Sequence, residues 1–153
     1  MDATPPSLLA LTTYLLSRTG KTARGRLGAR LAERELRLWH MAVLAALADF
    51  GPHVQRELAQ RLAIDPSDVV KVLDDLARAG QVDRTRDTAD RRRILVTLTP
   101  AGRTALGELD AEARAVQDEL LAPLTAGERE QLHGLLLRVL AGTATAPTVT
   151  VPR

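Results

Sequence analysis

The chain has 153 residues, of which 45% are hydrophobic and 26% charged, which is the usual mix of one globular domain. It contains no cysteine, which excludes a disulfide framework, a thiolate zinc site, an iron–sulfur cluster and a cysteine nucleophile. No stretch approaches the ~20 apolar residues of a membrane span and the N-terminal segment has no signal-peptide pattern, so we expect a cytoplasmic protein without a membrane partner.

The charge is unevenly distributed along the chain, although the formal net charge is only +2. Residues 18–37 carry a local charge of +5 and residues 84–93 one of +3, whereas residues 100–142 carry −3. This polarity suits a protein that turns one cationic face toward a polyanion. The alternative is that these runs are ordinary solvated helix faces.

A third of all residues are Leu or Ala and only 2% are aromatic, which favours an all-helical core packed by aliphatic side chains. Apolar spacing predicts a first helix over residues 5–19 and a second over Glu33–Phe50, which Gly51 and Pro52 end. Three glycines in residues 20–28 loosen the pattern between them. We therefore expect a basic linker there.

The next segment predicts a helix-turn-helix. A short helix lies within residues 53–64, and the pair Asp65-Pro66 then supplies a good N-cap followed by the residue that tolerates the first helical position. The helix that starts there has an apolar inner face and ends at Gly80, which takes a left-handed conformation without steric cost. Two helices joined by so tight a turn are typical of this motif.

After Gly80 the hydrophobic period changes to two. Residues 81–85 and 94–98 predict the strands of a β-hairpin, and the basic segment between them predicts a long tip, so that the hairpin forms a wing. Thr99-Pro100 then starts a long helix, and Thr125 caps a last helix that ends at Gly142.

The predicted fold is therefore mainly α, a winged helix-turn-helix whose first, fifth and sixth helices form a helical dimerisation region. We expect a dimerisation helix and basic linker in residues 1–35, the winged helix-turn-helix in 36–100, further dimerisation helices in 101–142 and a disordered tail in 143–153.

A helix of this kind fits the major groove of double-stranded DNA, and arginines on a wing reach the minor groove. The candidate DNA contacts lie on the exposed face of the second motif helix and on the wing: Ser67, Asp68, Val70, Lys71, Arg84, Arg86, Asp90, Arg91 and Arg92. Asp74 and Asp75 repel a phosphate backbone, which confines contacts to the first two helical turns. Asp90 and Arg92 share a face of an extended segment and can bond to each other. In the alternative reading Asp68 only caps its helix, and the wing charges only solubilise a loop.

The wing carries a family resemblance. The string DRTRDTADRRRILVTLTPAG is similar to that of the multiple-antibiotic-resistance regulator (MarR) family, with matches at Asp87, Asp90, Arg92, Leu98, Thr99 and Gly102. The resemblance extends over residues 8–142 by helix order. It implies a homodimeric winged-helix transcription regulator, usually a repressor, in which Asp90 orients Arg92 toward the minor groove and a small effector alters DNA binding. Asp68 and Asp75 depart from the family pattern.

A homodimer is also expected on physical grounds, since two modules double the number of phosphate contacts and a partner covers the apolar stripes of the outer helices. Twofold symmetry then predicts a pseudo-palindromic site. A small aromatic or phenolic effector is expected near Trp39 and His40, although both residues are also ordinary core candidates. His53 and His133 have no metal-ligand spacing, and we expect no metal and no cofactor.

Two other classes of function compete with DNA binding: an enzyme and a protein-binding module. An enzyme is not expected, because the chain has no phosphate-binding glycine loop, no GxSxG elbow and no HExxH motif. The alternative function is a winged-helix module that binds a partner protein and not DNA. The acidic residues Asp68, Asp74 and Asp75 on the second helix of the motif, the predicted reading helix, favour this alternative.

Overall fold

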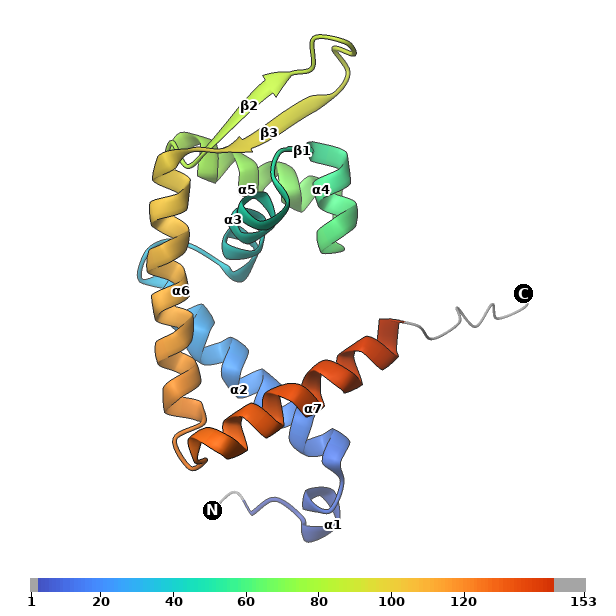
Figure 1. Cartoon of the computed structure of the whole chain (residues 1–153), viewed down its shortest axis with the longest axis vertical. Helices are drawn as coiled ribbons and strands as arrows, with labels where there is room; N and C mark the ends of the chain where they lie inside the picture. Colours follow the sequence, from blue (N-terminus) through green and yellow to red (C-terminus); the bar gives the residue numbers. More distant parts are fainter. Residues whose placement is uncertain (1–2, 145–153) are drawn as a thin grey trace, which may run out of the picture. The chain divides into compact units, whose positions relative to one another are not determined.

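The computed structural model describes residues 3–144 and confirms the mainly α winged-helix class (Figure 1). The elements are α1 (Pro6–Leu9), α2 (Thr12–Ala32), α3 (Leu38–Phe50), β1 (His53–Val54), α4 (Gln55–Leu62), α5 (Pro66–Arg78), β2 (Val82–Arg86), β3 (Ile94–Leu98), α6 (Pro100–Leu120) and α7 (Ala126–Ala144). They divide into two units, Met1–Val116 and Gln117–Arg153. Within residues 3–144 no helix has the length and apolar character needed to cross a membrane.

The N-terminal region corrects two expectations. The predicted first helix is split into α1 and α2, and α2 runs without a break through the three glycines that were expected to form a linker. Each helical glycine costs roughly 0.5–1 kcal/mol relative to Ala, so the three together cost roughly 1.5–3 kcal/mol. Burying a Leu contributes about 1.5–3 kcal/mol. Leu31 of α2 is fully buried and Leu27 packs partly buried against the same core, so packing offsets the local preference. The second helix starts later than expected, at Leu38, after a loop in which Glu35 has a positive φ of 58°.

The helix-turn-helix is confirmed in α4 and α5. Ala63 adopts a left-handed conformation at the end of α4, and the Asp65 carboxylate accepts a hydrogen bond from the Ser67 amide to cap α5. Gly80, with a φ of 72°, follows α5 as predicted. The apolar faces of α3, α4, α5 and the sheet form one buried core, whose largest members include Val43, Leu44, Leu47, Leu58, Val69, Leu73, Leu76, Val82 and Val96.

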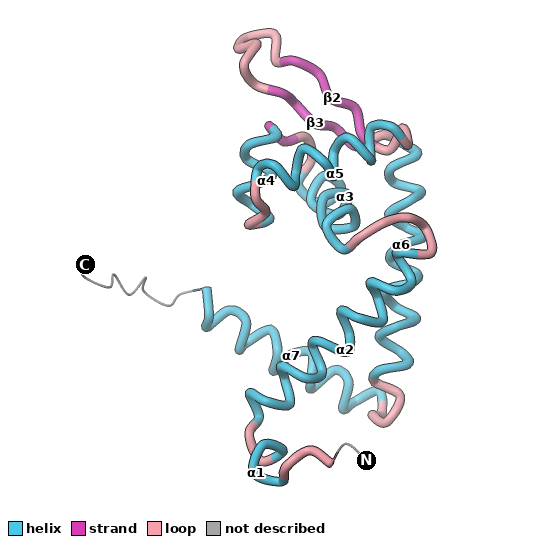
Figure 2. Tube along the Cα trace, turned by 180° about the vertical axis from the view of Figure 1, so that it is seen from behind, coloured by secondary structure: helices cyan, strands magenta, loops and turns pink. Residues whose placement is uncertain are grey.

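The sheet has three antiparallel strands in the order β1-β3-β2. The wing hairpin is confirmed: β2 pairs with β3 from Val82 opposite Leu98 to Arg86 opposite Ile94, and Figure 2 shows its two long strands and the loop that joins them. The short strand β1, which the sequence did not predict, pairs His53 with Val96. This third strand anchors the wing to the segment between α3 and α4.

The start of α6 is packed tightly against the base of the wing. The Thr99 hydroxyl donates to the Gly80 carbonyl and accepts from the Gly102 amide, at 2.6 and 3.0 Å. A Cβ atom added to Gly102 would lie 2.1 Å from the Gln81 carbonyl oxygen. Only glycine therefore fits at this crossing of chain segments.

The second unit contains the end of α6 and all of α7. Thr125 caps α7 as predicted, because its hydroxyl accepts from the Glu128 amide and the Glu128 carboxylate accepts from the Thr125 amide. Hydrogen bonding of the Glu128 carboxylate to Thr125, first to its backbone amide and then to its side chain, lowers the pKa of Glu128. The helix continues to Ala144, so the predicted tail loses its first two residues to α7 and otherwise lies outside the described residues. Leu135, Leu137, Val139 and Leu140 of α7 are all exposed in the single chain.

Candidate nucleic-acid interface

The first two turns of α5 present the predicted helix residues to solvent. Asp68, Val70 and Lys71 are exposed, as expected for groove contacts. Ser67 is also exposed, but its hydroxyl donates to the Asp65 carboxylate at 2.5 Å. This bond and the one from the Ser67 amide lower the pKa of Asp65. Asp65 is therefore the N-cap of α5, and Asp68 lies within the first turn and does not cap the helix.

The acidic residues later in α5 are paired within the chain. Arg84 of β2 binds Asp74 through Nη1 and Oδ1 at 2.7 Å, with the two side chains 29% and 45% exposed. Asp75 accepts a hydrogen bond from His40 at 3.0 Å and lies 3.7 Å from Arg78, and its pKa is lowered mainly by the His40 bond. Arg84 thus holds the wing against α5 and neutralises an acid that the sequence suggested would repel DNA.

The tip of the wing is ordered by its own backbone. Arg86 donates from its guanidinium to the Arg91 carbonyl at 2.9 Å, and the Asp90 carboxylate accepts from the Arg92 amide at 3.0 Å. The expected bond between the side chains of Asp90 and Arg92 is not what the structure shows, because residues 91 and 92 form a turn and not an extended segment. Asp90 therefore shapes the loop and leaves the Arg92 guanidinium exposed.

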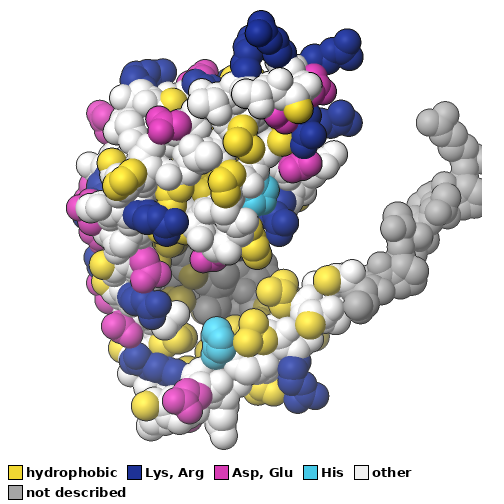
Figure 3. All heavy atoms as spheres, turned by 45° about the horizontal axis from the view of Figure 1, so that its top comes forward, with side chains coloured by type: hydrophobic (Ala, Val, Ile, Leu, Met, Phe, Trp, Pro, Cys, Tyr) yellow, Lys and Arg dark blue, Asp and Glu magenta, His cyan; other side chains and the backbone are white. Residues whose placement is uncertain are grey.

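Arg91 and Arg92 are the cations that the wing leaves available. Within residues 3–144 neither guanidinium forms a hydrogen bond or ion pair, whereas Arg93 lies 3.5 Å from Glu57 of α4. Figure 3 shows Lys and Arg side chains projecting at the wing end of the first unit. The tip can thus bring positive charge to a polyanion without first breaking a contact.

A polar groove of about 670 Å³ lies between α4 and the wing. It is lined by Arg56 and Gln60 of α4 and by Asp90, Arg92 and Arg93 of the wing. Arg56 is exposed and was missed as a candidate contact. Arg56 could have been found from its position in the sequence, because it lies in the first turn of the first motif helix, the element that crosses the phosphate backbone in this motif.

The predicted effector residues Trp39 and His40 lie beside α5 but differ in exposure. A cleft of about 530 Å³ is lined by both residues together with Arg37 and, from α5, Lys71 and Asp75 among others. Trp39 is 45% exposed, whereas His40 is 3% exposed and uses both ring nitrogens within the chain. Trp39 can therefore offer a ring face to a ligand, but His40 has no nitrogen free in this state.

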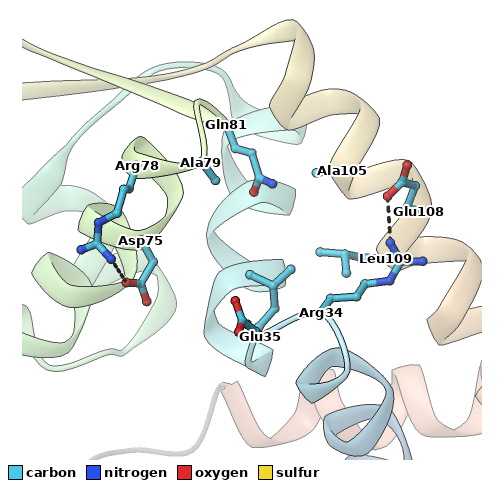
Figure 4. A pocket seen from close by; sticks show the side chains of 10 residues that line it. Arg34, Glu35, Asp75, Arg78, Ala79, Gln81, Ala105, Glu108 and Leu109 are labelled. Atoms are coloured by element: carbon cyan, nitrogen blue, oxygen red, sulfur yellow. Dashed lines mark hydrogen bonds and ion pairs between the residues drawn. The ribbon is translucent and has the colours of Figure 1, made fainter.

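A second cavity, of about 550 Å³, lies on the other side of Asp75, among the loop before α3, the end of α5 and α6 (Figure 4). Its charges are largely paired, since Arg34 binds Glu108 at 2.8 Å and Arg78 lies near Asp75. Arg34 and Arg30 also bind Glu112, so part of the basic segment 18–37 is neutralised by α6. Within residues 3–144 no group of three side chains is placed to hold a metal ion.

Comparison with known proteins assigns this architecture. A family model described as "MarR family" matches residues 35–93. The "HTH-type transcriptional repressor Mb2911" of Mycobacterium bovis is 31% identical over 123 residues, which cover 80% of this chain and 88% of that protein. The chain belongs to the MarR family. As a member it is a DNA-binding transcriptional regulator, and the comparisons give no support to a protein-docking module without DNA binding.

Solved structures of other regulators agree with the fold. The chain is similar to a probable transcriptional regulator from Pseudomonas aeruginosa, with a TM-score of 0.71 and 34% identity over 86% of this chain and 98% of that one. It is also similar to BpsR of Bordetella bronchiseptica, whose DNA binding is regulated by 6-hydroxynicotinic acid. Here the TM-score is 0.70 and the identity 28%, over 83% of this chain and 96% of that one.

Proposed function

We propose that this MarR-family protein is a cytoplasmic homodimeric repressor that binds a pseudo-palindromic DNA duplex and releases it when a small effector binds. The observation that carries the proposal is the division of charge around α5. Asp74 and Asp75 are paired inside the chain, whereas the guanidinium groups of Arg91 and Arg92 at the wing tip have no partner within residues 3–144. The face offered to DNA is therefore more cationic than the sequence suggests.

In this proposal the first two turns of α5 enter the major groove. Lys71 contacts a guanine or a phosphate, Val70 a thymine methyl group and Asp68 a cytosine amino group, while Ser67 accepts from a base. Arg91 and Arg92 reach into the minor groove, where the negative potential is largest. Arg84, Arg86 and Asp90 then act indirectly, because their contacts shape and hold the wing.

The proposed dimer brings two such modules to one duplex. Residues 36–100 form the reading module in this scheme, and the helices of residues 1–35 and 101–142 join the protomers. Each unit has exposed leucines that a partner protomer would cover, among them Leu9 and Leu15 in the first unit and Leu135 and Leu140 in the second. Twofold symmetry then places the half-sites roughly 34 Å apart, about one helical turn of DNA.

Selection of bound duplexes from a random pool tests the proposal. Purified wild-type protein should enrich an inverted repeat with half-site centres about one turn apart. Lys71→Ala combined with Arg92→Ala should lose both affinity for that repeat and part of the salt dependence. Recovery of no enriched repeat would overturn the proposed function, and enrichment of a single half-site would overturn the proposed symmetry.

The effector proposed for the Trp39 cleft is a small aromatic or phenolic molecule. The exposed face of Trp39 provides a surface for stacking, and Arg37 and Lys71 can donate to a phenolate or carboxylate oxygen. Lys71 is also a proposed DNA contact, so a ligand bound there competes directly with the duplex. The regulation of DNA binding by 6-hydroxynicotinic acid in the similar protein BpsR supports an effector of this chemical class.

Trp39 provides a direct test because it is the single tryptophan of the chain. Titration with 4-hydroxybenzoate, salicylate and 6-hydroxynicotinate should quench its fluorescence with a saturable curve for at least one compound, and that compound should weaken binding of the selected duplex. Arg37→Ala should weaken the ligand effect. Quenching without any change in DNA binding would contradict the proposal that this cleft is regulatory.

A further inference from the structure

His40 connects two helices that the DNA-binding module must hold in register. It lies in the first turn of α3 with only 3% of its surface exposed. The Arg37 backbone amide donates to Nδ1 of His40 at 2.9 Å, and Nε2 of His40 lies 3.0 Å from Oδ2 of Asp75 on α5. The ring thus takes the place of the Glu or Gln side chain that closes a helix capping box, and it reaches a second helix as well.

These partners define the protonation of the ring. A backbone amide can only donate, so Nδ1 of His40 carries no proton, and the proton of the neutral ring is on Nε2, which donates to Asp75. Within residues 3–144 this is the only hydrogen bond that joins α3 to α5. Both helices also contribute apolar side chains to the same buried core, among them Leu44 and Leu73.

A directional bond restrains the rotation of a helix more narrowly than apolar contacts do, since hydrophobic attraction has no preferred angle. Asp68, Lys71 and Asp75 are spaced by three and four residues, so they share one face of α5. All three also line the same cleft as His40. A bond that fixes Asp75 therefore also fixes the rotation of α5 about its axis, and with it the side of the helix on which Lys71 lies.

We propose that His40 is a positioning residue for DNA recognition, which through Asp75 sets the rotation of α5 and hence the approach of Lys71 and Asp68 to the bases. The inference rests on the proposed function, because it assigns α5 as the reading helix. The bond from His40 is also the first cause of the lowered pKa of Asp75.

Two matched pairs of variants separate positioning from charge and from packing. Asp75→Asn and Asp75→Ala remove the same charge, but only Asn keeps an oxygen that can accept from His40. His40→Gln keeps an acceptor and a donor in its terminal carboxamide, whereas His40→Leu keeps bulk alone. Asp75 is about half exposed, so its variants should fold even if His40→Leu does not.

The readout is the dissociation constant for a duplex that the wild-type protein has selected from a random pool, measured well below each variant's melting temperature. We expect Asp75→Ala to bind about tenfold more weakly than Asp75→Asn, and His40→Leu about tenfold more weakly than His40→Gln, which corresponds to the loss of one hydrogen bond. Equal affinities within the Asp75 pair would overturn the inference. So would a His40→Gln variant as weak as His40→Leu.

A second measurement does not depend on DNA. In ¹⁵N spectra of the free protein, the His40 ring should show a protonated Nε2 and an unprotonated Nδ1, and the signals should change in Asp75→Ala but not in Asp75→Asn. The opposite tautomer would overturn the inference. If the wild-type protein selects no duplex, the proposed function fails, and these spectra alone then decide whether His40 restrains α5.

Discussion

The base and the tip of the wing use the same residue type in opposite ways. At the base, Arg84 of β2 binds Asp74 of α5 at 2.7 Å. Arg93, next to the tip and just before β3, also holds the hairpin, since it lies 3.5 Å from Glu57 of α4. At the tip, the side chains of Arg91 and Arg92 form no hydrogen bond or ion pair within residues 3–144. A run of arginines in the sequence thus divides into cations that hold the hairpin and cations that remain available to a polyanion.

The largest effect should come from disturbing the base where no adjustment is possible. Gly102→Ala places a Cβ atom 2.1 Å from the Gln81 carbonyl oxygen, so we expect the free energy of unfolding to fall by about 3 kcal/mol. Urea denaturation measures the change. Gly107→Ala, on an open face of the same helix, should instead stabilise the protein by up to about 1 kcal/mol. Equal behaviour of the two variants would contradict the packing described for the wing base.

Removal of the tip cations should affect DNA binding and leave folding unchanged. Arg91→Ala combined with Arg92→Ala should weaken binding of the selected duplex by about 2 kcal/mol, roughly 30-fold. The free energy of unfolding should change by less than about 0.5 kcal/mol, because both side chains are exposed. Arg103→Ala, an exposed cation on α6, controls for the loss of positive charge. An equal loss of affinity in that control would show that the tip has no special role.

The Arg84–Asp74 pair at the base should contribute to stability by a smaller amount. Because both side chains are partly exposed, we expect Arg84→Ala to cost about 1 kcal/mol or less in the free energy of unfolding. A double-mutant cycle with Asp74→Ala measures the coupling by urea denaturation, and a value of about 0.5 kcal/mol is expected. A coupling of zero would mean that the wing is held by its strand pairing alone.

The smallest effect concerns cations outside the wing. Hydrogen bonds from Arg30 and then Arg34 lower the pKa of Glu112 below that of the unfolded chain. Its contribution to stability is therefore complete above the usual glutamate range and disappears as the pH falls through the lowered pKa of the folded state. The difference in urea midpoint between wild type and Glu112→Gln should shrink between pH 6 and pH 3. A difference that stays constant over this pH range would contradict the pairing of Glu112 with Arg30 and Arg34.

Local signals predicted the elements that place the interface. Asp65 and Pro66 start α5, Thr125 starts α7, and the change to a period of two after Gly80 marks the wing. Each signal depends on residues only a few positions apart, so it can be recognised without knowledge of the fold. The position of the reading helix and of the wing followed from these signals.

The failures of prediction depend on residues far apart in the chain. The glycines of α2 read as a linker because the buried Leu31 and the Arg30–Glu112 pair, which hold α2 in place, become visible only in the fold. The two-residue strand β1 exists only through its pairing with β3. The roles of Arg84 and His40 likewise depend on Asp74 and Asp75, which reach them only after α5 has packed.

The salt dependence of DNA binding tests the central claim most directly. Plots of log Kd against log salt concentration for the selected duplex should have slopes that differ between tip and base variants, since each lost phosphate contact changes the slope by about 0.9. The account predicts that Arg91→Ala with Arg92→Ala lowers the slope of the dimer by about two to four units, while Arg84→Ala leaves it unchanged. Equal slopes for the wild type and the tip variant would contradict the account.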